Sequence, residues 1–241
     1  MSTASTFLTV SGIPVDVIYK DIKNLHIGVY PPNGRVRVAA PESLDDEVVR
    51  LAVVQRLRWI KTRRAQLQDA ERQSVREMVT GETHYVWGER LRLKVVERPG
   101  RALVEVSGSR LRLLVPPGTS AADRYQVLEN WHRAQLKARI PNLVAKWEPV
   151  VGRTVSGWTV RRMKTKWGSC NPKTGRISVN LELAKKHPGC LEYIIVHEMT
   201  HLRERKHGER FTELISDYLP GWQALRDELN QAPLSHEEWT W

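Results

Sequence analysis

The chain has 241 residues, of which 41% are hydrophobic and 27% charged, two cysteines and a formal net charge of +11. This composition is typical of globular proteins. It excludes a membrane span, because no apolar run reaches about eighteen residues. It also excludes a disulfide framework, because the two cysteines, Cys170 and Cys190, stand in a chain without a recognisable secretory signal. We therefore expect one large or two modest domains in a cytoplasmic protein that makes no membrane contact, has reduced thiols, and carries a basic surface suited to polyanions.

The first part of the chain reads mainly as strands. Apolar and polar residues alternate over residues 14–19, 26–30 and 35–38. A helix should then run from about residue 45 to 72, capped by Ser43, Asp45 and Asp46. Its apolar residues recur three and four positions apart and predict one buried stripe, made of Val48, Val49, Ala52, Val53, Leu57 and Ile60.

Positive charge is dense on this helix. Six cations fall within residues 50–64, namely Arg50, Arg56, Arg58, Lys61, Arg63 and Arg64. A solvated helix face is the simpler interpretation of such a run. The alternative is a contact with phosphate groups, through which the protein would bind nucleic acid.

The remaining elements predict an α+β fold. Strands are expected at residues 85–87, 91–96, 103–106, 111–115, 159–162 and 176–180. Helices are expected at about 121–147, with Pro141 interrupting or kinking it, and at about 191–202 and 208–218. The break at Pro116-Pro117-Gly118 is the candidate boundary between a β-rich domain with one long helix, residues 1–118, and a mostly helical domain with a small sheet, residues 119–241.

The pattern His-Glu-x-x-His occurs at His197, Glu198 and His201. On a helix, residues four apart project from one face, so both imidazoles can bind one zinc ion at roughly 2.0–2.1 Å. Glu198 lies about a hundred degrees round the helix, where it can take a proton from a zinc-bound water instead of binding the metal. Only about 0.02 such matches are expected by chance from this composition. The pattern therefore predicts a catalytic zinc site.

A catalytic zinc site keeps three protein ligands and one open position. His207, Glu213 and Asp217 could each supply the third ligand. We favour His207, because a turn soon after His201 would return a short side chain to the metal. The cysteines are not expected to bind it, since two more ligands would close the site and make it structural.

Three segments resemble a known family. They are Lys-Thr-Lys-Trp-Gly-Ser-Cys at residues 164–170, Gly-Arg-Ile-Ser-Val-Asn-Leu with a further Leu at 175–183, and residues 197–207 followed by Phe211. Together they resemble the YgjP-like metal-dependent hydrolases, or YgjP-like metallopeptidases, relatives of the SprT-like and minimal gluzincin-type proteases. The order of the preceding strands and helix extends the resemblance over essentially the whole chain. Val179 stands where Leu is commoner, which leaves the chemistry unchanged.

This resemblance implies a zincin-like catalytic domain at residues 119–241, with one zinc ion held by His197, His201 and His207 and with Glu198 as the catalytic acid and base. It also implies that the strand Ile177–Leu181 borders the cleft, where an exposed edge would pair with an extended peptide. The expected substrate-cleft residues are Trp167, Arg176, Ile177, Val179, Asn180, Tyr193 and Arg203. The candidate donors to a developing oxyanion are Arg176, Tyr193, Arg203 and Tyr218.

The leading functional hypothesis is a zinc metallopeptidase acting on extended or unfolded protein. Hydrolysis of nucleoside triphosphates has also been ascribed to the family, so the alternative is a UTP-type pyrophosphohydrolase. Its phosphate-binding residues would be Arg161, Arg162, Lys164, Lys166 and Arg176. Such chemistry usually uses magnesium held by a cluster of acids, and no such cluster is evident here. A second alternative, a nucleic-acid-associated module with a structural zinc, rests on net charge alone.

Overall fold

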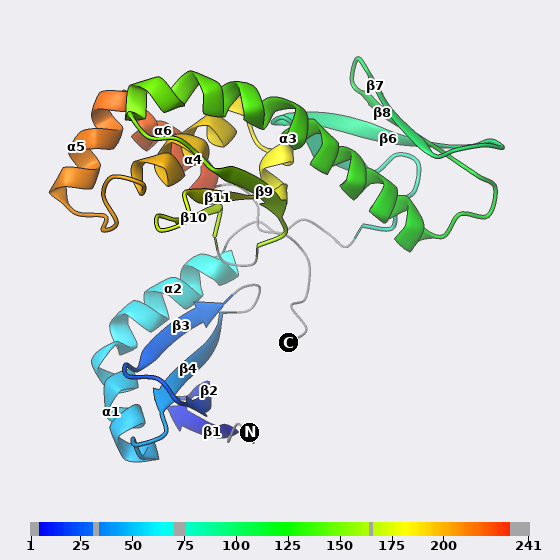
Figure 1. Ribbon diagram of the computed structural model, residues 1–241. Helices are drawn as coiled ribbons and strands as arrows, with labels where there is room; N and C mark the ends of the chain where they lie inside the picture. Colours follow the sequence, from blue (N-terminus) through cyan, green and yellow to red (C-terminus); the bar gives the residue numbers. More distant parts are fainter. Residues whose placement is uncertain (1–4, 31–33, 70–75, 164–165, 232–241) are drawn as a thin grey trace. The chain divides into compact units, whose positions relative to one another are not determined.

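The computed structural model describes residues 5–30, 34–69, 76–163 and 166–231, and its mixed helices and sheets confirm the α+β class (Figure 1). The chain divides into two compact units, one within residues 1–75 and one within residues 76–232. Among the described residues, no helix combines the length and apolar character that crossing a bilayer requires.

The first unit is a four-stranded sheet with two helices. Its strands are β1 (Ser5–Val10), β2 (Ile13–Lys20), β3 (His26–Tyr30) and β4 (Arg35–Pro41), in the order β1-β2-β4-β3. β2 and β4 run parallel, whereas β1 and β3 pair antiparallel at the two edges. Valines on alternate positions of β2 and β4 are fully buried against the helices. β1 was not expected from the sequence.

The single helix expected at residues 45–72 is two helices, α1 (Asp46–Gln55) and α2 (Leu57–Asp69). Asp45 caps α1 by accepting a hydrogen bond from the Val48 N–H at 2.8 Å. A tight turn separates the two helices, because the Arg56 N–H bonds to the carbonyl of Val53. The buried stripe is confirmed at Val49, Val53 and Ile60, but Val48 is 44% exposed.

The second unit begins with a four-stranded sheet covered by a long helix. Its strands are β5 (Thr83–Val86), β6 (Glu89–Glu97), β7 (Leu103–Ser107) and β8 (Arg110–Val115), in the order β5-β6-β8-β7. The helix α3 (Ala121–Val151) continues through Pro141. Gly152 caps its C-terminus, with a φ of 68° and an N–H that donates to the carbonyl of Glu148. Prolines at 141 and 149 therefore do not divide this helix.

A small three-stranded sheet follows. It contains β9 (Gly157–Arg161), β10 (Gly168–Asn171) and β11 (Arg176–Asn180), in the order β10-β11-β9. β11 lies in the middle, antiparallel to β10 and parallel to β9. A short 3-10 helix, η1 (Leu181–Lys185), continues from β11. The segment around Cys170, for which the sequence predicts no strand, is thus β10 at one edge of this sheet.

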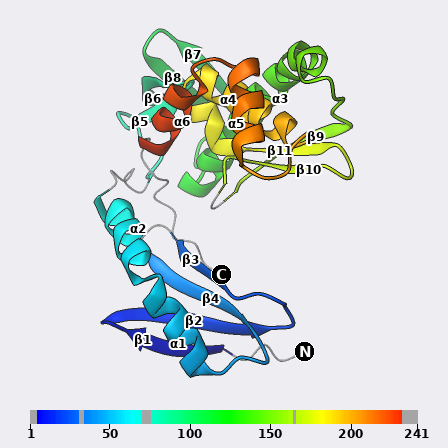
Figure 2. The ribbon, with the colours of Figure 1, turned by 90° about the vertical axis from the view of Figure 1, so that its left-hand side faces the viewer.

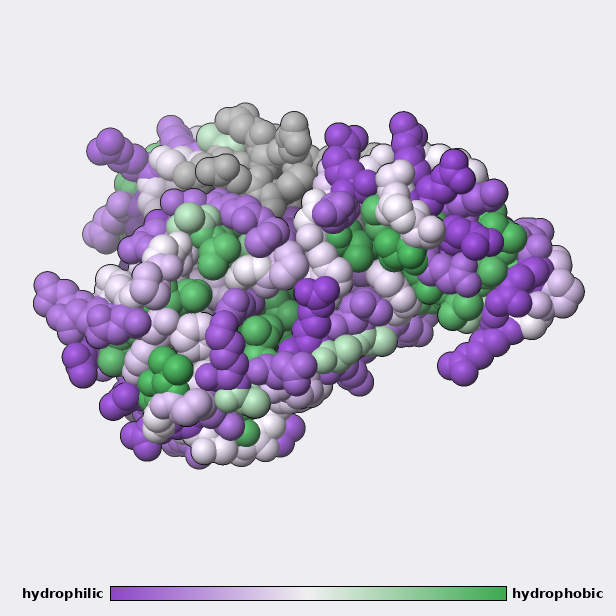
Figure 3. Space-filling view, turned by 90° about the horizontal axis from the view of Figure 1, so that it is seen from above, coloured by the Kyte–Doolittle hydropathy of each residue, from purple (hydrophilic) through white to green (hydrophobic). Residues whose placement is uncertain are grey.

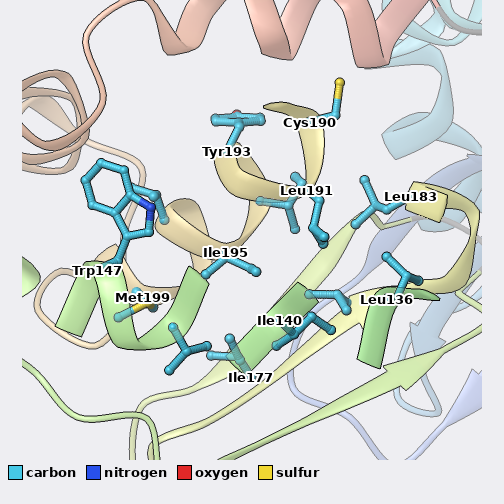
Figure 4. Close-up of a cluster of buried hydrophobic side chains, with 14 of the residues drawn as sticks. Leu136, Ile140, Trp147, Ile177, Leu183, Cys190, Leu191, Tyr193, Ile195 and Met199 are labelled. Carbon is cyan, nitrogen blue, oxygen red and sulfur yellow. The ribbon is translucent and has the colours of Figure 1, made fainter. Parts of the chain in front are cut away.

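Three helices complete the unit: α4 (Pro188–Thr200), α5 (Glu209–Tyr218) and α6 (Trp222–Gln231). Both ribbon views place α5 and α6 beside α4, and α3 also packs on α4 (Figures 1 and 2). Ile195 and Met199 of α4 meet Ile140 of α3 and Ile177 of β11 in one buried cluster (Figure 4). α4 is therefore the central helix of this core.

The compact units divide the chain at residue 75, whereas the sequence suggested a boundary at residue 118. Pro116-Pro117-Gly118 lies inside the second unit, between β8 and α3. The physical reason is a shared core, since Leu111 and Leu113 of β8 pack with Leu128 of α3. A proline-rich turn can connect two elements of one core as readily as two domains.

Candidate metal centre

The helix α4 is buried along most of its length. Its residues from Tyr193 to Val196 are at most 5% exposed, because this apolar run packs into the core on several sides. Glu192 ties α4 to α3 by accepting hydrogen bonds from Lys146 at 2.6 Å and from the Trp147 indole at 2.9 Å. The C-terminal end of α4 is therefore held firmly where His197 and Glu198 lie.

Three histidines converge at this end of α4. His197 belongs to its last turn, His201 directly follows it, and His207 returns to the site just before α5. Each offers a ring nitrogen, and the three atoms all lie within 4.8 Å of one another. Nε2 of His207 is 3.0 Å from Nε2 of His197. The structure thus brings together the three residues that the sequence singled out.

The turn after α4 orients the rings. Arg203 and Glu204 both donate their N–H groups to the carbonyl of Thr200, which reverses the chain. Nδ1 of His201 lies 3.0 Å from the carbonyl oxygen of Glu204 and donates to it, since a carbonyl only accepts. Nε2 of His201 is then left with a free lone pair, the form that binds a metal.

The lowered pKa values of His197 and His201 favour the binding of a cation by these side chains. Burial, together with the neighbouring His201 and His207, lowers the pKa of His197 to about 3, so its ring is neutral near pH 7. Burial also lowers the pKa of His201. The Nε2 atoms of His197 and His207 face each other at 3.0 Å, so a cation in this region could take a lone pair from each ring. Three histidine imidazoles form a typical zinc donor set.

Phe211 on α5 forms an apolar wall beside the cluster. Its ring centroid lies 5.0, 4.7 and 4.8 Å from those of His197, His201 and His207, respectively. The Phe211 side chain is only 3% exposed. Its position restricts all three imidazoles at once. From the sequence, Phe211 entered only through the family resemblance, because a lone phenylalanine gives no sign of contact with three histidines.

Glu198 is buried next to the histidines, with 5% of its surface exposed. Burial raises the pKa of its carboxyl group to about 8, and the positive charge of Lys166 opposes this rise. Gly168 on β10 faces the carboxyl so closely that a Cβ built there would lie 2.4 Å from Oε1 of Glu198. β10 therefore leaves room for the carboxyl only because residue 168 has no side chain.

Asn180 holds the segment that leads into β10. Its side-chain amide donates to the carbonyl of Met163 at 2.7 Å and to that of Lys166 at 2.8 Å. Its own N–H donates to the carbonyl of Trp167 at 2.8 Å. Asn180 is 4% exposed, so these bonds lie away from solvent. It acts as a support for the chain next to Gly168 rather than as a group presented to a substrate.

The expected pairing of a peptide with the strand Ile177–Leu181 is contradicted, because β11 already pairs on both sides. Ile177 and Val179 are 1% and 0% exposed, so their side chains belong to the core. Within the described residues, β10 pairs only with β11 and is the edge strand nearest Glu198. Residue spacing alone does not reveal which strand of a small sheet lies at its edge.

The predicted cleft residues Arg176, Trp167 and Tyr193 differ in how they relate to the histidine cluster. Arg176 begins β11 and packs on Gly157, whereas Trp167 is partly buried against the core with Lys186 over its ring. Tyr193 is 5% exposed, stacks on Trp222 and meets His197 edge-on at 5.8 Å between ring centroids. Of these side chains, Tyr193 is therefore the one with a described contact to the histidine cluster.

The other polar residues predicted to bind substrate form hydrogen bonds with other groups or lie outside the histidine cluster. Arg203 donates to the Val151 carbonyl at 3.1 Å and to the Tyr218 hydroxyl at 3.2 Å. Arg162 binds Glu129 at 2.8 Å, and Arg161 is exposed at the end of β9. Lys164 lies outside the described residues. Among the residues that are described, the group that could hold a metal ion consists of the three histidines, without Glu213, Asp217, Cys170 or Cys190.

A protein family and two solved structures are similar to this chain. A family model described as YgjP-like, metallopeptidase domain, matches residues 23–232. Among solved structures, the metallopeptidase zymogen of Pyrococcus abyssi abylysin is 19% identical, with a TM-score of 0.35 over 37% of this chain and 90% of that chain. The metallopeptidase zymogen of Methanocaldococcus jannaschii jannalysin is 21% identical, with a TM-score of 0.34 over 38% and 94%. No curated protein shows a significant match.

Proposed function

The chain belongs to the YgjP-like metallopeptidase family, and from this premise we propose that it is a zinc-dependent peptidase. His197, His201 and His207 would hold one zinc ion, and Glu198 would act as the general base. The observation that carries the proposal is the convergence of three ring nitrogens within 4.8 Å beside the buried carboxyl of Glu198. A catalytic zinc site needs three protein ligands and an adjacent base in this arrangement.

The chemical roles follow from the side chains. A zinc ion held by the three histidines would act as a Lewis acid, polarising the peptide carbonyl and making water nucleophilic near neutral pH. Glu198 takes the proton of the attacking water and passes it to the amine that leaves. Gly168 leaves the space in which its carboxyl moves, and Phe211 keeps the imidazoles in one orientation and limits water around them. Among the candidate hydrogen-bond donors, Tyr193 is the one whose ring contacts His197.

An extended substrate would lie along β10. This strand is the described edge of its sheet on the side of Glu198, so its free backbone groups can pair with a peptide. A substrate held in this way must be locally unfolded. We therefore propose extended or unfolded protein as the substrate class.

Hydrolysis of nucleoside triphosphates remains the alternative reaction for the same site. Lys166 is exposed close to Glu198 and could bind a phosphate. Arg162, however, is bound to Glu129 on α3, and the described residues contain no cluster of acids that would hold magnesium. These points favour peptide hydrolysis.

The test compares zinc-loaded wild type and Glu198→Gln against unfolded casein-like protein and a panel of nucleoside triphosphates. Glu213→Gln serves as the control, because Glu213 is exposed and forms an ion pair only with Arg210, which is also exposed, within the described part of the chain. We expect proteolysis by the wild type and the control, loss of it in Glu198→Gln, and equal zinc content in all three. Triphosphate hydrolysis lost in Glu198→Gln, without proteolysis in the wild type, would replace the proposal by the alternative.

A further inference from the structure

The outward face of the β5-β6-β8-β7 sheet carries an unusual set of cations. The inner face packs on α3 through residues such as Leu91, Leu93 and Leu111, which are at most 3% exposed. Residues between them in sequence point the other way, since side chains alternate along a strand. Those outward residues on β6 and β8 are Arg90, Arg92, Lys94, Arg110 and Arg112.

The pairing of β6 with β8 places like charges side by side. Arg92 is the register partner of Arg110, and Lys94 is the partner of Arg112. Adjacent strands lie about 4.8 Å apart, and like charges at neighbouring positions destabilise a sheet. Stability of the fold therefore does not explain why these residues are cationic.

The charge is only partly compensated. Arg112 forms a half-exposed ion pair with Glu105 at 3.0 Å, and Arg92 donates to the carbonyl of Gly81 at 2.7 Å. Arg90, Lys94 and Arg110 are exposed, and none of them forms an ion pair with another residue in the described part of the chain. The face thus offers several cations that are free to meet an external anion.

We propose that this face binds the phosphate backbone of a single strand of nucleic acid. Arg90, Arg92 and Lys94 repeat every two residues along β6, about 6.8 Å apart, which is comparable to the separation of successive phosphates on one strand. Four of the five cations are arginines, whose planar guanidinium groups bind phosphate oxygens in pairs. The patch is only two strands wide, so it suits one backbone.

An aromatic side chain extends this patch. Tyr85 on β5 is the register partner of Arg90 and is partly exposed, whereas His84 and Val86 on either side of it are buried. A ring at the end of a row of cations can stack on a base, as in proteins that bind single-stranded nucleic acid. Stacking on a base would add to the phosphate contacts, and this combination of a ring with a row of cations is why we assign the face to nucleic acid.

The proposed nucleic-acid surface does not coincide with the run of cations at residues 50–64 that the sequence singled out. The cations of residues 50–64 lie on the helices of the first unit, whereas the proposed surface lies on a sheet of the second. Figure 3 shows hydrophilic side chains spread over the surface seen from above, with hydrophobic groups between them, so hydrophilic surface by itself does not mark the site. The register of the sheet is what gathers these five cations.

The test uses the double variant Lys94→Gln, Arg110→Gln of the full chain, which removes one member of each like-charge pair. Lys137→Gln, Arg153→Gln is the matched control, since both residues are exposed cations of the same unit outside this sheet. Binding of a fluorescent single-stranded oligonucleotide of mixed sequence is measured by anisotropy at several salt concentrations. We expect the double variant to bind about tenfold more weakly near 0.1 M salt, with a salt slope smaller by about 1.4.

Thermal unfolding separates binding from folding. The double variant should unfold at or above the wild-type temperature, because like-charge contacts are relieved and neither side chain forms a hydrogen bond with another described residue. Equal binding by the double variant and the control, or no binding by the wild type, would overturn the proposal. Tighter binding to a duplex, to phosphatidylserine vesicles or to polyglutamate would also overturn it and would assign the face to that polyanion instead.

Discussion

A side chain on Gly168 would collide with Glu198, because a Cβ there would lie 2.4 Å from Oε1 and 2.8 Å from the carboxyl carbon. Real Cβ atoms do not approach other atoms so closely. The edge strand β10 and the helix α4 therefore fit together only with a glycine at this position. The contact links the Trp-Gly-Ser-Cys segment to the residue proposed as the general base.

We predict that Gly168→Ala impairs catalysis without removing the metal. The added methyl group displaces the carboxyl of Glu198, and a shift of about 1 Å in a catalytic group lowers kcat by up to about a hundredfold. KM and zinc content should stay near the wild-type values, as measured by steady-state proteolysis and metal analysis. Ser169→Ala on the same strand is the control and should keep its activity. Equal kcat in both variants would show that the contact has no catalytic consequence.

His207→Ala should lose zinc while keeping the fold. His207 is exposed, so its removal leaves no cavity in the core, but the site keeps only two imidazoles. We expect zinc affinity to fall by about a hundredfold or more in a chelator competition assay. The rise in Tm that zinc gives the wild type should shrink accordingly, because a ligand stabilises only the state that binds it. His26→Ala, an exposed histidine of the first unit, should behave as wild type in both assays.

Asn180→Ala should destabilise the fold. The buried amide of Asn180 donates to the carbonyls of Met163 and Lys166, and alanine leaves both acceptors without this donor. Loss of such buried bonds lowers the free energy of unfolding by roughly 2–3 kcal/mol. Urea denaturation measures the change, with Asn171→Ala as the control, because Asn171 is exposed at the end of β10 and its side chain accepts from the exposed turn that follows. A similar midpoint in both variants would contradict a supporting role for Asn180.

Stability should depend on pH through His132 of α3, which is 3% exposed. Burial lowers the pKa of His132 to about 3 in the folded chain, whereas the unfolded chain keeps the ordinary value near 6.5. Below about pH 6.5 the unfolded state takes up a proton that the folded state does not, so stability is lost as the pH falls toward 3. Between pH 7 and pH 5 this loss is roughly 2 kcal/mol.

The measurement compares wild type with His132→Gln by urea denaturation at pH 7 and pH 5, with zinc content held equal. Other titrating groups act in both proteins, so they cancel in the difference between the two pH dependences. We expect the variant to lose about 2 kcal/mol less than the wild type on acidification. Identical pH dependences would mean that His132 titrates in the folded chain much as it does in the unfolded one.

Local patterns were enough to single out the three histidines that the structure brings together. The spacing of His197, Glu198 and His201 places them on one helix end irrespective of the remaining fold, because helical geometry relates residues four apart. His207 followed from the short distance along the chain, which restricts where a turn can carry it. Strands β2, β3 and β4 were likewise visible as alternation, and the capping residue Asp45 as a local hydrogen-bond signal.

The strand order and the contacts around the histidines depend on residues far apart in the sequence. The order of strands in a sheet depends on contacts between residues far apart in sequence, so only the tertiary structure showed β11 in the middle and β10 at the edge. The same is true of the contact between Gly168 and Glu198, of Phe211 against three imidazoles, and of the cations that β6 and β8 bring together. The sequence by itself determined which residues can bind a metal, since that depends on chemistry and local spacing. What surrounds them was decided by packing, which no local pattern encodes.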